Sequence, residues 1–352
     1  MAVDAEVLQA LIDEKLKPLV KKIDEEAYYA EDFLYALGKA GFFASTQKDE
    51  QTTLLDELTI VQETAKVCMT TAFCLWCHLA ALTYIRKTDN EQLRANILTL
   101  LESGDVLGAT GLSNPMKYYA GLEKIHLSAE RVEGGYVING VLPAVSNLGE
   151  NHWFGAIALN GEQEVMVFVS TDNADITLKE KIHFLGVNGS ATYTCKFDNV
   201  FVADDYVVTH EASSFVDIIR PTFVLYQIPL GFGVVASSVE GIEKVKAKQN
   251  GCNEYLQIQA EELTGKLKHL QTTLKNLIQS GEVNLQAICQ IRLQAVYDTL
   301  AAVQANMLHN GSAGYIAGST PSRKLREAYF FANLTPTVRQ LEKMTQILKK
   351  AE

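Results

Sequence analysis

The chain has 352 residues, of which 47% are hydrophobic and 21% are charged, and its formal net charge is −11 at pH 7. A chain of this length and composition can form two or three domains around a large buried core. The acidic balance argues against nucleic acid or an anionic membrane as the main partner, so an anionic small molecule would need a local basic patch.

The sequence predicts neither a targeting segment nor a membrane span. Residues 1–22 mix acidic and basic side chains throughout and so lack the apolar core of a signal peptide. We find no run of about 18 apolar residues, so no membrane-spanning helix is expected. The six cysteines are scattered along the chain, which favours reduced thiols and a cytoplasmic location over a disulfide framework.

Apolar residues recur at helical spacing through roughly the first 110 residues. The segment 72–85 is almost entirely apolar, which predicts a helix buried on all sides. Gly41 and Gly104 follow two of the expected helices and are typical of helix C-termini. The helices are expected near residues 8–20, 30–39, 54–67, 72–85 and 91–103.

The composition changes after Gly108, where Val, Ile, Thr, Tyr and Phe become frequent between Gly, Asn and Asp residues. Residues 132–140 show the pattern of a strand, a tight turn at Gly134 and a second strand. Further strands are expected at 164–170, 191–197 and 201–207. About 100 residues of short strands predict a compact β barrel or sandwich.

Helical spacing returns after Phe215 and continues to the end of the sequence. Four long helices joined by short Gly-, Asn- or Pro-containing links predict an antiparallel bundle. They are expected at 215–249, 254–280, 284–310 and 322–351. The predicted fold class is therefore α+β. Its predicted domains are an N-terminal helical domain (1–108), a central β barrel (109–212) and a C-terminal four-helix bundle (213–352).

Several short segments, taken in order, resemble the acyl-CoA dehydrogenase family of flavoproteins. Residues 139–147 are similar to the family's N-G-x-K-x-W-I-T-N segment, and residues 185–192 to its L-G-x-x-G-S-x-T segment. No motif is decisive alone, but together they span nearly the whole chain. The other matching segments are Gly111–Pro115, Phe197–Val202, Asn310–Tyr315 and Arg326–Ala328.

The resemblance implies an FAD-dependent oxidoreductase that acts on an acyl thioester, such as an acyl-CoA, or on a related small acid derivative at a CH–CH group. It also implies a homodimer or homotetramer in which the FAD site is completed across the subunit boundary. Ser113 and Ser146 keep hydroxyl groups beside the expected flavin ring, although each could instead serve a turn or a strand end. The residues implied to bind the cofactor are Leu112, Ser113, Ala144, Val145, Ser146, Lys248, Asn310, Gly311 and Gly314.

The expected catalytic base is missing. The family's dehydrogenases remove an α proton with a Glu that lies shortly after the R-D-A segment, and here Asn333 occupies or adjoins that position. An amide cannot accept that proton. Asp217 is a weak substitute and is expected instead to cap a helix start. Two alternatives to the dehydrogenase therefore stay open: a flavin monooxygenase of the same superfamily, and a non-catalytic homologue.

Other residues are interpreted as structural. Cys74 and Cys77 form a C-x-x-C pattern within an apolar helix, which favours a buried core helix over a redox or zinc site. His78 is expected to be a satisfied core histidine, and no set of histidines has metal-ligand spacing. Residues 116–119 are expected in an exposed loop.

Overall fold

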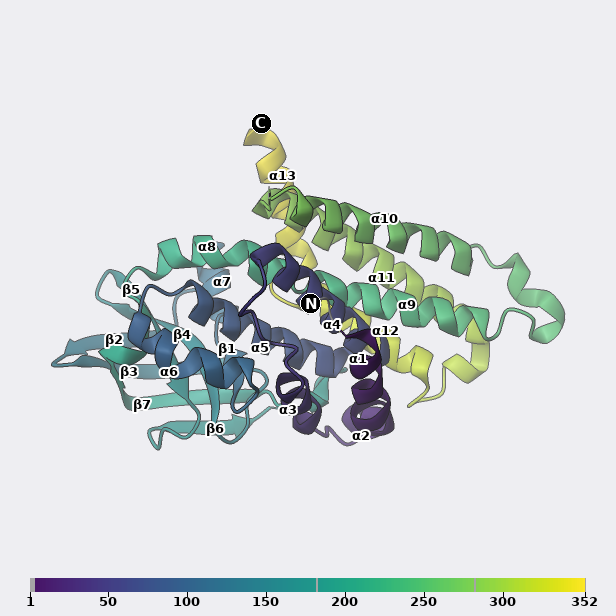
Figure 1. Cartoon of the computed structure of the whole chain (residues 1–352). Helices are drawn as coiled ribbons and strands as arrows, with labels where there is room; N and C mark the ends of the chain where they lie inside the picture. Colours follow the sequence, from purple (N-terminus) through teal and green to yellow (C-terminus); the bar gives the residue numbers. More distant parts are fainter. Residues whose placement is uncertain (1–3, 182, 282, 352) are drawn as a thin grey trace.

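Helices occupy both ends of the chain, and one eight-stranded sheet lies between them in sequence (Figure 1). The structure is a computed structural model that describes residues 4–181, 183–281 and 283–351. The predicted order of helices, strands and helices is confirmed. The predicted domain boundaries, in contrast, remain predictions.

The N-terminal helices pack around α5, which is buried along nearly its whole length. Local capping starts three of them, because the side chain of Asp4 accepts from Val7 N (3.1 Å), that of Asp49 from Thr52 N (2.7 Å) and that of Asn90 from Leu93 N (3.0 Å). The first expected helix is interrupted by a π turn (Ile12–Leu16) and a 3₁₀ turn (Lys17–Leu19). The α-helices are α1 (Ala5–Leu11), α2 (Val20–Glu25), α3 (Glu31–Lys39), α4 (Glu50–Val67), α5 (Met69–Lys87), α6 (Glu91–Glu102) and α7 (Ser113–Tyr119).

The strands form one mixed sheet in the order β6-β7-β3-β2-β4-β5-β8, and β1 pairs in parallel with β4. Strands β2 and β3 are the predicted hairpin, with the turn at Gly134. The strands are β1 (Leu107–Thr110), β2 (Leu127–Val132), β3 (Gly135–Val145), β4 (His152–Asn160), β5 (Gln163–Ser170), β6 (Ile176–Glu180), β7 (Tyr193–Ala203) and β8 (Val207–Thr209).

The prediction of a closed β barrel is wrong, because the described parts of β6 and β8 do not pair and the sheet stays open. Helix α5 packs against β1 and so covers sheet surface that a closed barrel would bury in its interior. The approach is close: a Cβ atom at Gly155 in β4 would lie 2.9 Å from the Tyr84 ring. Glycine at this position therefore allows the helix to lie directly on the sheet.

The helices between residues 228 and 333 form the bundle on the right of Figure 1, whereas the helix at 212–225 lies over the sheet on the left. The expected helix 215–249 is two helices that part at Tyr226 and Gln227, and the expected helix 322–351 parts between Asn333 and Val338. Pro336 lies in the second break, where it removes a backbone donor and disfavours helix at the preceding residue. The helices are α8 (Ala212–Leu225), α9 (Ile228–Glu243), α10 (Ala260–Gln279), α11 (Leu285–Gly314), α12 (Thr320–Asn333) and α13 (Val338–Ala351).

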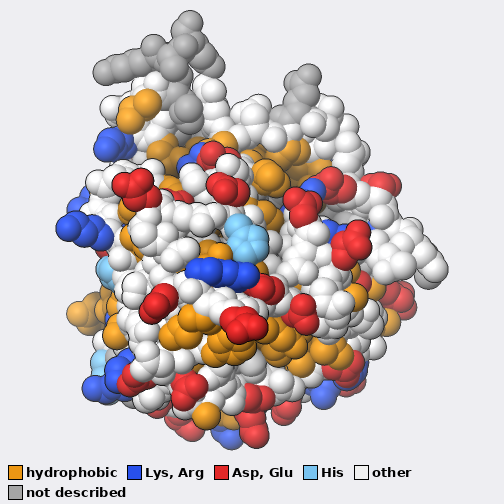
Figure 2. Space-filling view, turned by 90° about the vertical axis from the view of Figure 1, so that its left-hand side faces the viewer, with side chains coloured by type: hydrophobic (Ala, Val, Ile, Leu, Met, Phe, Trp, Pro, Cys, Tyr) orange, Lys and Arg blue, Asp and Glu red, His pale blue; other side chains and the backbone are white. Residues whose placement is uncertain are grey.

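One helical stretch, Ala212–Glu243, is long and apolar enough to cross a membrane by length and composition alone. Most of it is buried inside the protein, as in the core helix of a folded domain. The end of the molecule that carries the sheet shows acidic and basic side chains mixed together, with hydrophobic side chains gathered in a band between them (Figure 2).

Candidate functional site

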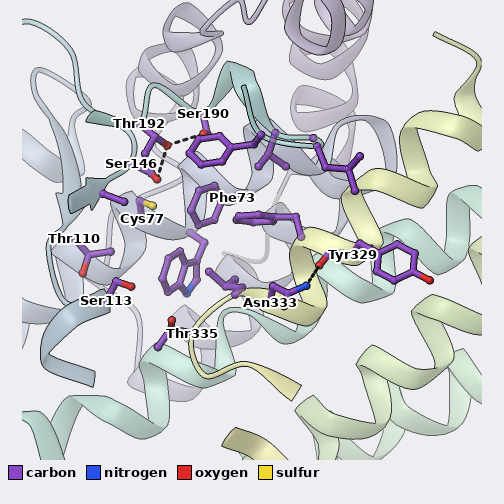
Figure 3. Close-up of a pocket in the computed structure, with 18 of the residues that line it drawn as sticks. Phe73, Cys77, Thr110, Ser113, Ser146, Ser190, Thr192, Tyr329, Asn333 and Thr335 are labelled. Atoms are coloured by element: carbon purple, nitrogen blue, oxygen red, sulfur yellow. Dashed lines mark hydrogen bonds between the residues drawn. The ribbon is translucent and has the colours of Figure 1, made fainter. Parts of the chain in front are cut away.

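A cavity of about 330 Å³ lies where α5, the sheet, α8 and α12 meet. Its walls differ in chemistry. Hydroxyl groups from the sheet and its loops line one side, aromatic rings from the helices line another, and the C-terminal end of α12 forms a third (Figure 3). The volume is near the lower end of the range for small-molecule sites.

The hydroxyl wall combines residues that are far apart in the sequence. An antiparallel bridge between Thr110 and Ser146 joins the ends of β1 and β3. Thr192 Oγ1 lies 2.7 Å from Ser146 Oγ and 2.8 Å from Ser190 Oγ. Each hydroxyl has one donor and two acceptor sites, so these three linked hydroxyl groups can still form hydrogen bonds to a ligand. The wall consists of Thr110, Ser113, Ser146, Ser190 and Thr192.

The aromatic wall is a set of rings in mutual contact. Trp76 stacks on Phe73 at a centroid distance of 5.6 Å and meets Phe223 edge-on at 4.8 Å. Trp76 Nε1 also donates to Phe223 O (3.1 Å), which ties α5 to α8. Phe330 from α12 meets Phe73 edge-on at 4.7 Å. These contacts make a rigid apolar surface opposite a polar one.

The third wall is the end of α12, where Asn333 Nδ2 donates to Tyr329 O (2.8 Å). The chain that follows is held from behind. Gln227 Nε2 donates to Thr335 O (2.9 Å), and Arg292 Nη2 donates to Phe331 O (2.9 Å). Buried donors therefore fix both sides of Asn333.

No carboxylate lines the cavity among the described residues. Burial raises the pKa of the Cys77 thiol well above its usual value, so this group stays protonated at neutral pH. Asp217 lies within α8, away from the cavity lining, and accepts from Arg220 Nη2 (2.9 Å). The prediction that Asp217 caps the helix start is wrong, because Glu211 holds the N-cap position of α8.

The structure divides the predicted cofactor residues into two groups. Ser113, Ala144, Ser146 and Asn333 line the cavity, and the buried residues Leu112 and Val145 adjoin them in the chain. Lys248 and Asn310 line a different cavity of about 350 Å³ in the bundle, which shares no lining residue with the first. Gly311 has a φ of 56° within α11, and Gly314 is buried beside Asn310.

Sequence reasoning missed several residues of the site. Ser190 and Thr192 belong to the matching segment 185–192, so the motif already contained the signal for them. Phe73, Trp76 and Phe223 gave no such signal, because aromatic residues at helical spacing look the same in a core as in a cavity wall.

Cys74, Cys77 and His78, for which the sequence favours a structural role, are buried. Cys74 and Cys77 are buried free thiols, and the described residues contain no group of three or more His, Cys, Asp or Glu residues able to hold a metal. His78 is buried, and its Nδ1 accepts from Gly108 N (2.9 Å), but its Nε2 has no partner, so it is only partly satisfied. The expected exposed loop at 116–119 is wrong: these residues belong to α7, and Met116 is buried.

The N-terminal part of the chain matches a known family. Residues 5–105 match the family model described as acyl-CoA dehydrogenase, N-terminal domain. The benzylmalonyl-CoA dehydrogenase of Aromatoleum aromaticum is 27% identical over 206 residues, which cover 56% of this chain and 54% of that protein. A probable acyl-CoA dehydrogenase of Mycobacterium tuberculosis is 21% identical over 66% of this chain and 63% of its own length. The matches thus span about half to two thirds of these relatives.

Solved structures show that the whole chain shares one fold with acyl-CoA dehydrogenases. Glutaryl-coenzyme A dehydrogenase, in its complex with glutaryl-CoA, has a TM-score of 0.85 at 15% identity and covers 100% of this chain and 96% of its own. Butyryl-CoA dehydrogenase from Megasphaera elsdenii has a TM-score of 0.82 at 15% identity, over 97% and 95% of the two chains. KijD3 in complex with FMN and a dTDP-sugar has a TM-score of 0.77 at 18% identity, over 99% of this chain and 95% of its own.

Proposed function

Because the resemblance to the acyl-CoA dehydrogenase family is confirmed in the N-terminal domain and in the fold, we propose that this protein is a flavin-dependent oxidoreductase acting on an acyl thioester or a related small acid derivative. The observation that carries the proposal is the cavity itself. A row of hydroxyl groups faces a wall of aromatic rings at the junction of the sheet and the helices.

The residues of this cavity fit a flavin ring. Such a ring needs an apolar slot and a few directed hydrogen bonds to its nitrogen and oxygen atoms. Ser146, Thr192 and Ser190 offer linked hydroxyls on one side, while Phe73 and Trp76 offer apolar contact on the other. When bound, the flavin would supply the acceptor for the electrons of the substrate.

We further propose that the flavin is FAD and that two subunits complete its site. Lys248 and Asn310 do not line the first cavity, but they line another cavity in the bundle, whose lining mixes polar and apolar residues. Lys248 lies there on an exposed surface where a phosphate group from another subunit could reach it. This arrangement supports a homodimer or homotetramer.

The acid–base chemistry is where this chain departs from the family pattern. In the proposed site, Asn333 takes the position of the base, but it can only donate or accept a hydrogen bond there and cannot take up the proton. The described lining therefore favours substrates whose oxidation needs no side-chain carboxylate, or whose proton passes to water. For the same reason, we expect turnover with ordinary acyl-CoAs to be slow.

The visible absorption spectrum of the purified protein tests the proposal. We expect a bound flavin, or uptake of one from added FAD, and loss of its oxidised absorption when the right acyl-CoA is added without oxygen. A protein that takes up neither FAD nor FMN would overturn the proposal. If the protein binds flavin but no acyl-CoA bleaches it, the proposed cofactor is retained and the proposed substrate class is overturned.

A further inference from the structure

A second cavity, of about 340 Å³, lies at the opposite end of α5 from the flavin candidate site. It is enclosed by the loop before α4, the first turn of α4, the C-terminal end of α5, the first turns of α6 and the C-terminal end of α8. It shares no lining residue with the first cavity. We call it the Arg94 cavity and define it by its charged lining residues Lys48, Glu50, Arg86, Lys87 and Arg94.

Two of the four cations in this lining are neutralised by buried carboxylates. Arg86 Nη1 lies 2.8 Å from Glu57 Oε1, and its Nη2 lies 3.1 Å from Glu102 Oε1. Lys48 Nζ lies 2.9 Å from Asp56 Oδ2. These pairs are largely shielded from solvent, so Arg86 and Lys48 belong to the framework and have no charge to spare for a ligand.

The third cation is held only loosely. Lys87 Nζ lies 2.8 Å from Glu50 Oε1, but the Glu50 side chain is 67% exposed and the Lys87 side chain is 39% exposed. Exposed ion pairs of this kind contribute little, because water and salt screen them. Glu50 is also the only carboxylate in the described lining of the Arg94 cavity.

Arg94 has no carboxylate within 4.0 Å among the described residues. Its Nη2 donates to Thr88 O, and its Nε is buried without any hydrogen-bond partner. A buried guanidinium donor left unpaired costs free energy, and an anion placed beside it would remove that cost. Within the described lining, Arg94 is therefore the guanidinium without a carboxylate partner, and Lys87 adds a second positive charge to the same cavity.

The rest of the lining fits an anion with a small apolar body. Leu54 and Leu98 are apolar, and Thr222 of α8 adds a polar residue to the lining. We propose that the Arg94 cavity binds a small organic carboxylate, with its carboxylate group on Arg94 and Lys87 and its hydrocarbon part against Leu54 and Leu98. The site is independent of the flavin proposal, because none of its residues lines the first cavity.

The probe for this site is butyrate, compared with its neutral analogue butyramide by calorimetric titration of the full-length protein in a buffer free of carboxylates and phosphate. We expect saturable binding of butyrate and at least about tenfold weaker binding of butyramide, because the amide lacks the charge that Arg94 recognises. Equal binding of the two compounds would overturn the proposal. Tighter binding of inorganic phosphate than of butyrate would overturn the carboxylate class.

Two substitutions with opposite expected signs locate the site. Arg94→Gln should weaken butyrate binding by about tenfold or more, whereas Arg94→Lys should restore part of it. Glu50→Gln should tighten binding by about threefold, because it removes the competing carboxylate from Lys87. The matched control is Arg339→Gln, an exposed arginine on α13. Butyrate binding unaffected by both Arg94→Gln and Glu50→Gln would place butyrate elsewhere and overturn the proposal.

Discussion

The Arg292 guanidinium lies over the ring of Phe331, with 3.6 Å between its Cζ atom and the ring centroid. Arg292 is fully buried, and its bonds go to neutral groups, the side chain of Gln227 and the carbonyl of Phe331. Burial lowers the pKa of Arg292 to about 9. Among the described residues Arg292 has no acidic partner, so this buried cation holds the segment that carries Asn333 through neutral acceptors.

Arg292→Met should lower the free energy of unfolding by about 1–3 kcal/mol, because it leaves the buried Phe331 carbonyl and the Gln227 side chain without a donor. Chemical denaturation measures the change. The control is Arg339→Met on the exposed surface of α13, which should stay within about 0.5 kcal/mol of the wild type. If both variants were equally stable, Arg292 would not hold this segment in place.

Because His78 is buried, we expect the stability of the protein to depend on pH. Burial lowers the pKa of His78 to about 3, while an unfolded histidine titrates near 6.5. Between these values the unfolded state binds a proton that the folded state does not, so stability falls as the pH is lowered from about 6.5 toward 3. His78→Gln should therefore make unfolding less pH-dependent, by about 1–2 kcal/mol between pH 6 and pH 4.5.

Urea unfolding at several pH values measures this effect. The matched control is Cys74→Ala, on the same buried helix, because burial raises the pKa of Cys74 and keeps the thiol neutral throughout this range. The control should change the stability but keep the wild-type slope. A His78→Gln protein with the wild-type slope would show that His78 does not titrate as described.

The architecture was predictable from the sequence because its signals are local. The apolar run that forms α5, the Gly134 turn and the spacing of the bundle helices each specify an element without reference to distant residues. Matching motifs also placed Ser113, Ser146 and Asn333 around one cavity. The break at Gln227 has a local signal in Pro229, in the first turn of α9. The contacts that Gln227 makes there could not be predicted, because Thr335 and Arg292 lie 108 and 65 residues away in the sequence.

A buried ion cluster fastens α12 to the junction of α4 and α5. Glu327 Oε1 lies 2.8 Å from Arg323 Nη1, its Oε2 lies 2.9 Å from Lys324 Nζ, and Lys324 Nζ also donates to Ala65 O (2.8 Å). Burial raises the pKa of Glu327, but Lys324 and Arg323 together lower it more, so the net pKa lies below the usual value. The cluster depends on all three charges.

Glu327→Gln should lower the free energy of unfolding by about 3–5 kcal/mol, because Lys324 would remain buried without its carboxylate. Lys324→Met in the same chain should recover part of that loss, and the double-mutant cycle then gives the coupling between the two side chains. Additive effects of the two substitutions, measured by denaturation, would contradict a direct pairing.

Asn333 allows a test of the missing base. Under the proposed function, Asn333→Glu places a carboxylate at the cavity wall, where it can accept a proton from the substrate. We expect bleaching of the bound flavin by acyl-CoA to become about tenfold faster or more, with a rate that rises with pH as the new carboxyl group ionises. Asn333→Gln is the control, because Gln has nearly the same size as Glu but carries no charge. Equal rates for the two variants in stopped-flow absorbance would place the reacting carbon elsewhere.

A substitution of Lys248 tests both whether the flavin is FAD or FMN and whether another subunit completes its site. It lines the bundle cavity with Asn310 and does not line the first cavity. Under the proposed function, Lys248 would therefore meet the adenosine end of an FAD bound by another subunit. Lys248→Gln should therefore weaken FAD binding by about tenfold and leave FMN binding nearly unchanged, because FMN lacks that end.

Fluorescence titration of the flavin-free protein measures both affinities, and sedimentation shows whether the variant still assembles. Lys268→Gln, at an exposed position on α10, is the control for the loss of one positive charge. An oligomer that binds FAD equally well with Lys248→Gln and Lys268→Gln would show that Lys248 does not reach the cofactor. A monomeric wild type that binds FAD tightly would contradict the shared site, because the two cavities would then have to act within one chain.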